Sequence, residues 1–154
     1  MLPVSEFEDF MLCLENNNVR YLIIGGVAFI FHVKPRYTKD IDIWIECEPE
    51  NIRNVNKALV EFGSPCLFDE DDTDAVLQVG VEPNRIDLIL NVEEMNFEKA
   101  WKARVVNKYG AATVNWIGIQ DLYEIKSKID HPRHQSDAMD LKWVLEHPPE
   151  KPEK

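Results

Sequence analysis

Short apolar runs and alternating segments predict the strands of a sheet. The apolar run Tyr21–Ile24 indicates that the expected strand Val19–Ile24 is buried on both faces and lies at the centre of its sheet. Strict alternation over Ile41–Glu46 and over Arg85–Leu90 predicts strands whose polar and apolar side chains lie on opposite faces. Looser patterns predict three further strands, over Ala75–Val81, Val105–Asn107 and Ala112–Trp116.

Apolar residues at helical spacing predict helices between these strands. Ser5 and Glu8 match a capping box for the first helix, and Asn96 is a candidate N-cap for a later one. The final helix is expected to begin at Ser136 or Asp137, which places the preceding basic residues in a polar loop. The expected helices cover Glu6–Glu15, Val27–Val33, Pro49–Phe62, Phe97–Lys102, Gln120–Lys128 and a last segment ending near Leu145.

Length and composition indicate one soluble globular domain. The chain has 154 residues, of which 45% are hydrophobic and 29% charged. We expect a single domain over residues 1–147 and a disordered tail over residues 148–154, which are rich in proline and charge.

Nothing in the sequence predicts a membrane segment or an export signal. The longest apolar run, Tyr21–Phe31, is too short to span a bilayer, and the acidic N-terminus lacks a basic signal region. The three cysteines, Cys13, Cys47 and Cys66, have no metal-like spacing and suit a reducing compartment. We therefore expect a cytoplasmic protein with no membrane partner.

The net charge of −11 argues against passive binding of nucleic acid. DNA is therefore not an expected partner. If the chain handles phosphate groups, it must do so locally, through a bound metal and a few basic side chains near one site.

Three carboxylates are the candidate metal-binding groups. Asp40 and Asp42 share one face of their predicted strand, where two neighbouring carboxylates repel each other unless a cation lies between them. Hard oxygen ligands of this kind suit Mg²⁺ or Mn²⁺, although a solvated strand face is the simpler alternative. Asp87 lies in the middle of another strand, where it must pair with Arg85, be solvated, or join the first two.

A glycine pair follows the central strand directly. Gly25 and Gly26 would let the backbone approach a phosphate, and the N-terminus of the following helix favours an anion. Taken alone, however, a glycine pair is usually only a tight turn.

Together these features resemble the signature of the DNA polymerase β-type nucleotidyltransferase superfamily. The matching residues are Gly25-Gly26, a thirteen-residue spacer, Asp40-Ile-Asp42-Ile and the later Asp87. The sequence from Arg36 to Asp42 is similar to that of small bacterial nucleotidyltransferases of toxin–antitoxin and abortive-infection systems. A C-terminal pattern resembles the same group, with Asp121-Leu122, Lys126, Arg133, Asp137 and Asp140-Leu141.

The resemblance implies an α+β nucleotidyltransferase fold, with a small mixed or antiparallel sheet flanked by helices and a C-terminal helical segment. It implies that Asp40, Asp42 and Asp87 are catalytic and ligate Mg²⁺ or Mn²⁺. It also implies that Gly25, Gly26 and Lys126 contact the triphosphate of an NTP, with ATP as the expected substrate. Gly26 stands where many members have Ser, and Lys126 could equally be a helix-surface charge.

The implied function is an enzyme that moves a nucleoside monophosphate from an NTP to a hydroxyl of a protein or RNA. Its setting would be a toxin–antitoxin system with a cognate partner protein. The alternative is a catalytically weak or inactive antitoxin or regulator of the same fold that acts by binding a protein. A third hypothesis is a toxin that modifies tRNA.

Overall fold

The structure, a computed structural model, describes residues 4–38, 40–80 and 85–148. Six helices and six strands are assigned among these residues. In chain order they are α1 (Val4–Asn16), β1 (Tyr21–Ile24), α2 (Gly25–His32), β2 (Asp40–Ile45), α3 (Pro49–Phe62), β3 (Val76–Val79), β4 (Arg85–Ile89), α4 (Phe97–Lys102), β5 (Val105–Tyr109), β6 (Ala112–Trp116), α5 (Ile119–Ser127) and α6 (Pro132–Glu146).

The strands form one mixed sheet in the order β3-β4-β2-β1-β6-β5. The pairs β2/β4 and β1/β6 are parallel, whereas β1/β2, β3/β4 and β5/β6 are antiparallel. All four residues of β1 are buried, as the apolar run predicts for a central strand. The expected α+β class with a mixed sheet is confirmed.

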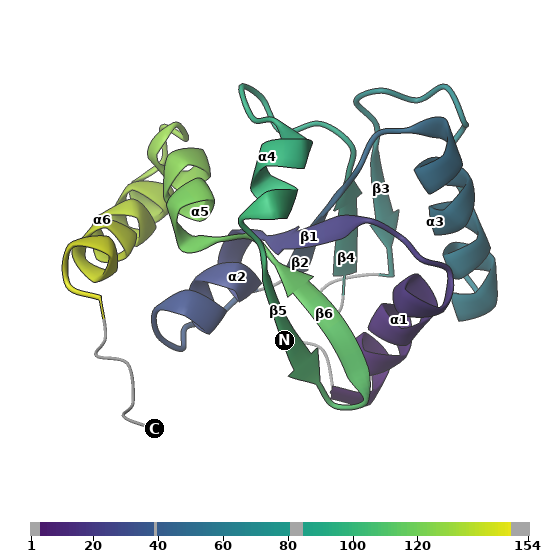
Figure 1. The fold of residues 1–154 in the computed structure, drawn as a ribbon, viewed down its shortest axis with the longest axis horizontal. Helices are drawn as coiled ribbons and strands as arrows, with labels where there is room; N and C mark the ends of the chain where they lie inside the picture. The colour runs from purple at the N-terminus through teal and green to yellow at the C-terminus, as the bar shows by residue number, and fades with distance from the viewer. Residues whose placement is uncertain (1–3, 39, 81–84, 149–154) are drawn as a thin grey trace.

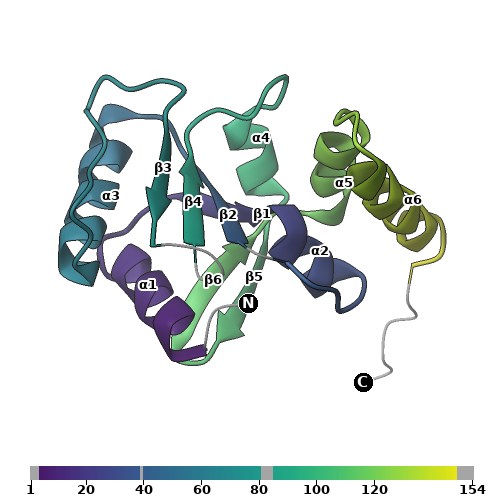
Figure 2. The ribbon, with the colours of Figure 1, turned by 180° about the vertical axis from the view of Figure 1, so that it is seen from behind.

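The helices other than α4 gather at two ends of the molecule, and α4 lies between them (Figure 1). Helices α1 and α3 pack against each other at one end, and α5 and α6 lie side by side at the other, next to α2. The view from behind shows the same separation (Figure 2). Because α2 also packs on β1 and β2, it joins the C-terminal helices to the centre of the sheet.

Four helix starts differ from the sequence-based prediction, that of α5 by a single residue, since it begins at Ile119 rather than Gln120. Helix α1 begins at Val4 rather than Glu6. Helix α2 begins at Gly25 rather than Val27, so the glycine pair forms its first turn. Helix α6 begins at Pro132 because His131 Nδ1 accepts a hydrogen bond from the backbone N–H of Arg133, and proline is favourable at a first helical position.

Buried apolar side chains from both ends of the chain form one core cluster. None of the described helices is long and apolar enough to cross a membrane. Among the described residues, all three cysteines are free thiols. The expected strand end at Val81 and nearly all of the expected tail lie outside the described residues.

Candidate active site

The three candidate carboxylates come together on two adjacent strands. In the parallel register of β2 and β4, Asp42 lies opposite Asp87 and Asp40 lies opposite Arg85. Asp40, Asp42 and Asp87 each offer an oxygen, and these oxygens lie within 4.8 Å of one another. Asp87 therefore joins the pair on β2, which was one of the three arrangements that its sequence position left open.

Arg85 neutralises part of this negative charge. Its Nη2 atom lies 2.8 Å from Asp40 Oδ2, and its Nε atom lies 2.9 Å from Asp87 Oδ1. Asp87 Oδ2 also accepts a hydrogen bond from Nη2 at 3.2 Å. Arg85 is thus more than a partner for Asp87, because its guanidinium joins both strands through two of the three carboxylates.

The surroundings of Asp42 disfavour its charged form. Burial, followed by the charges of Asp40 and Asp87, raises the pKa of Asp42 to about 7, against an ordinary value of 3.8. The cations of Lys126 and Arg85 oppose this rise but do not cancel it. A group of carboxylates that repel each other in this way is stabilised by a further cation.

The glycine pair is required by close packing around the carboxylates. Gly25 has a φ of +69°, and a side chain there would collide with the carboxylate of Asp42. A Cβ at Gly26 would lie 2.7 Å from the Thr38 hydroxyl. Gly26 faces the pocket described below, whereas Gly25 lies directly behind Asp42.

A pocket of about 260 Å³ opens beside the carboxylates. Asp40 and Asp42 contribute its acidic side, and Arg36, Lys126 and Arg133 contribute its basic side. The remaining lining residues are Gly26, Thr38 and His134. Segments almost a hundred residues apart therefore meet here, since α6 supplies Arg133 and His134 while β2 supplies the carboxylates.

Asp137 organises the basic side of the pocket. One of its oxygens, Oδ2, lies 2.8 Å from Arg36 Nη2 and 3.0 Å from Lys126 Nζ. Lys126 is only 2% exposed, so the alternative of a helix-surface charge is wrong. Burial lowers the pKa of Lys126, and the hydrogen bond to Asp137 opposes that effect. An unpaired charge this deep would be costly, so Asp137 is what keeps a cation at this position.

His134 and Arg133 line the pocket from the first turn of α6, which begins at Pro132 rather than at Ser136 or Asp137. His134 Nδ1 lies 3.2 Å from Lys126 Nζ, and burial followed by the charge of Lys126 lowers the pKa of His134. Arg133 donates a hydrogen bond from Nη2 to the backbone oxygen of Tyr37 at 2.7 Å. The prediction that these two residues lie in a polar loop is therefore wrong. Proline at position 132 is the local sequence signal for a helix start.

The residues present suit a divalent metal. Three carboxylate oxygens within 4.8 Å form a hard donor set, and burial together with the two neighbouring carboxylates raises the pKa of Asp42 despite Lys126 and Arg85. Mg²⁺ or Mn²⁺ is the ion class for such a set. Asp40, Asp42 and Asp87 are the residues that would hold it.

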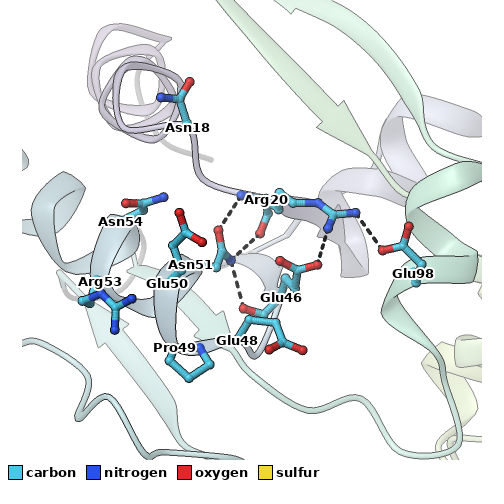
Figure 3. A pocket seen from close by; sticks show the side chains of 10 residues that line it. All are labelled: Asn18, Arg20, Glu46, Glu48, Pro49, Glu50, Asn51, Arg53, Asn54 and Glu98. Carbon is cyan, nitrogen blue, oxygen red and sulfur yellow. Dashed lines mark hydrogen bonds and ion pairs between the residues drawn. The ribbon is translucent and has the colours of Figure 1, made fainter.

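A larger pocket, of about 790 Å³, lies at the opposite end of β1 and β2 (Figure 3). Arg20 is central there, with its guanidinium 2.6 Å from Glu46 and 2.8 Å from Glu98. The buried side chain of Asn51 ties the backbone of Arg20 to that of Glu46. Among the described residues, this pocket holds no cluster of metal-ligating side chains like Asp40, Asp42 and Asp87, so it is a weaker candidate for catalysis than the smaller one.

No protein-family model matches the chain, and no curated protein gives a significant match. Solved structures do resemble it. The lincosamide antibiotic adenylyltransferase LnuA, with lincomycin bound, is 16% identical, with 91% of this chain and 96% of LnuA covered and a TM-score of 0.61. ANT(2″)-Ia in complex with adenylyl-2″-tobramycin is 14% identical, covering 92% and 88% with a TM-score of 0.56.

A third similar structure is an antigenic nucleotidyltransferase-like protein from Paracoccidioides brasiliensis. It is 14% identical, with 94% of this chain and 76% of that chain covered and a TM-score of 0.60. At these identities the comparison concerns the course of the backbone rather than the chemistry. The mixed sheet, the flanking helices and the C-terminal helix pair show that this chain has the nucleotidyltransferase fold.

Proposed function

We propose that this protein is a metal-dependent nucleotidyltransferase that moves a nucleoside monophosphate from an NTP to a hydroxyl of a protein or RNA. One observation carries the proposal. Carboxylates suited to a divalent metal and side chains suited to phosphate, Arg36, Lys126 and Arg133, face each other in one pocket. A metal-bound triphosphate carries the charges that complement both sides.

The reaction forms a bond between the acceptor oxygen and the α-phosphorus and breaks the bond from that phosphorus to the bridging oxygen. Pyrophosphate leaves with that oxygen. Asp87 is the group proposed to take the acceptor proton. A divalent metal bound by the three carboxylates would supply charge stabilisation to the reacting phosphate. Lys126 and Arg36 would hold the leaving phosphates, since both are kept in place by Asp137.

ATP is the nucleotide we propose. Two proteins with similar folds, LnuA and ANT(2″)-Ia, are described respectively as an adenylyltransferase and as a complex with an adenylylated product. The proposed setting is the cytoplasm, in a toxin–antitoxin pair with a cognate protein. Support for this setting is the sequence similarity around Arg36–Asp42 and the three free thiols among the described residues.

The experiment is label transfer. The protein is incubated with Mg²⁺, cell lysate and ATP, GTP, CTP or UTP labelled at the α-phosphate, and the protein, RNA and small-molecule fractions are counted separately. We expect transfer from ATP into protein or RNA by the wild type and none by Asp42→Asn. Asp71→Asn is the matched control, because it makes the same change on an exposed carboxylate outside the sheet, in the turn before β3.

Absence of transfer with every nucleotide would overturn the enzymatic proposal. If a partner toxin were then neutralised equally well by wild type and Asp42→Asn, the alternative of a non-catalytic antitoxin would stand in its place. Label in the small-molecule fraction alone would keep the reaction and change the acceptor class.

A further inference from the structure

The guanidinium of Arg85 contacts two of the three carboxylates that would bind the metal. It starts β4, directly opposite Asp40 in the parallel register and two residues before Asp87 on the same strand face. Its side chain therefore lies over the carboxylates rather than pointing away from them. This placement follows from the pairing of β2 with β4, and the local sequence around Arg85 does not reveal it.

The contacts of Arg85 use the atoms that a metal would need. Both oxygens of Asp87 accept hydrogen bonds from its guanidinium, at 2.9 and 3.2 Å, and Asp40 Oδ2 accepts a third at 2.8 Å. Asp42 takes no part in these three hydrogen bonds. The guanidinium thus engages two of the three candidate ligands and leaves the third for another cation.

Charge opposes simultaneous occupation of the site by Arg85 and a metal. An arginine stays protonated at every accessible pH, so it cannot yield by losing its charge. A guanidinium and a divalent ion sharing the same carboxylates repel each other strongly in a partly buried site. Arg85 can yield by moving, because its side chain is 24% exposed and so has a path to solvent.

We propose that Arg85 is a resident counter-cation that competes with the metal for Asp40 and Asp87, so that it sets the metal affinity of the site. In the metal-free protein it holds the carboxylates of β2 and β4 together. On metal entry its guanidinium swings away from at least one of them. The inference rests on the proposed metal site but adds a role that the nucleotidyl-transfer reaction does not require.

Metal binding without nucleotide tests this role. Mn²⁺ affinity is measured by calorimetry, and by electron paramagnetic resonance of the free ion, for wild type, Arg85→Gln and Arg85→Lys. Arg53→Gln is the matched control, because it removes the same charge from an exposed ion pair with Glu70 at 3.8 Å. We expect Arg85→Gln to bind Mn²⁺ about tenfold more tightly than wild type, with Arg85→Lys in between and Arg53→Gln unchanged.

The direction of the change in Mn²⁺ affinity shows whether Arg85 competes with the metal or only orients the carboxylates. If Arg85 only orients the carboxylates, Arg85→Gln will bind Mn²⁺ more weakly than wild type, and that result or an unchanged affinity overturns the inference. Thermal unfolding gives a second readout: Arg85→Gln should be less stable than wild type in EDTA and should gain more stability from Mn²⁺.

The proposed site itself is tested separately by Asp42→Asn. Suppose that wild type binds Mn²⁺ and Asp42→Asn does not, but that Arg85→Gln binds Mn²⁺ no more tightly than wild type. That result would overturn only the role of Arg85. Absence of Mn²⁺ binding by wild type and by Arg85→Gln alike would overturn both this inference and the metal site on which it rests.

Discussion

Asp42 and Asp87 are direct partners in the parallel ladder between β2 and β4. This pairing puts two carboxylates from residues 45 positions apart on one face of the sheet, and Asp40 joins them from the next position on that face. Like charges brought this close destabilise a fold unless a cation compensates them, and such clusters are found most often at functional sites.

Asp87 should be essential for transfer and dispensable for folding. We expect Asp87→Asn to lower nucleotidyl transfer by more than about a hundredfold, because it removes both a metal ligand and the proposed proton acceptor. The circular dichroism spectrum should be unchanged. Comparable activity in Asp87→Asn and in the exposed control Asp71→Asn would exclude Asp87 from the reaction.

The buried pairing of Asp137 should make a large contribution to stability. Asp137→Asn leaves Lys126 and Arg36 without their shared carboxylate, and removing one partner of a buried ion pair costs about 3–5 kcal/mol. The control on the same helix is Asp140→Asn, which breaks an exposed pair with Lys34 and should cost less than about 1 kcal/mol. Urea unfolding measures both, and equal losses would contradict the role of Asp137.

Gly25 should be intolerant of a side chain for two reasons that can be separated. Gly25→Ala forces alanine into the left-handed region and pushes a methyl group against the carboxylate of Asp42. Gly63→Ala imposes a similar backbone strain at a φ of +95° with nothing near its Cβ, so it should cost only about 1 kcal/mol. We expect Gly25→Ala to cost more than this and to weaken Mn²⁺ binding, which Gly63→Ala should leave unchanged.

The metal-free protein should become less stable as the pH rises through neutrality. Burial and its two carboxylate neighbours raise the pKa of Asp42 from 3.8 to about 7. Between these values the folded protein holds a proton that the unfolded chain has lost, so the stabilisation is complete below 3.8 and is lost as the pH rises through about 7. Urea unfolding in EDTA at pH 5 and pH 8 measures this decline.

Asp42→Asn should flatten that dependence. The amide carries no charge at any pH, so the variant should be more stable than wild type at pH 8 by about 1–3 kcal/mol and should gain nothing from added Mg²⁺. Parallel pH profiles for wild type and variant would show that Asp42 is not the group responsible.

Much of this site could be predicted from local pattern. Alternation alone placed Asp40 and Asp42 on one strand face and put Asp87 in the middle of another, because side chains on a strand have a period of two. The N-cap role of Asn96 was likewise readable, and its side chain does accept a hydrogen bond from the backbone N–H of Lys99.

What could not be predicted depends on contacts between distant segments. The bridge from Arg85 to Asp40 requires the parallel register of β2 and β4, which no local pattern states. The burial of Lys126 depends on Asp137, on the next helix. A lysine at that helical position looks the same whether its partner is a carboxylate or water.

In the proposed function, the carboxylates of β2 and β4 and the basic side chains around Asp137 together bind a metal-bound triphosphate. A crystal structure with Mn²⁺ and a non-hydrolysable ATP analogue tests it most directly. We expect anomalous density for manganese beside Asp40 and Asp42, with the triphosphate against Lys126 and Arg36 and with Arg85 moved from its present contacts. Nucleotide bound elsewhere, or no manganese at these carboxylates, would contradict the account.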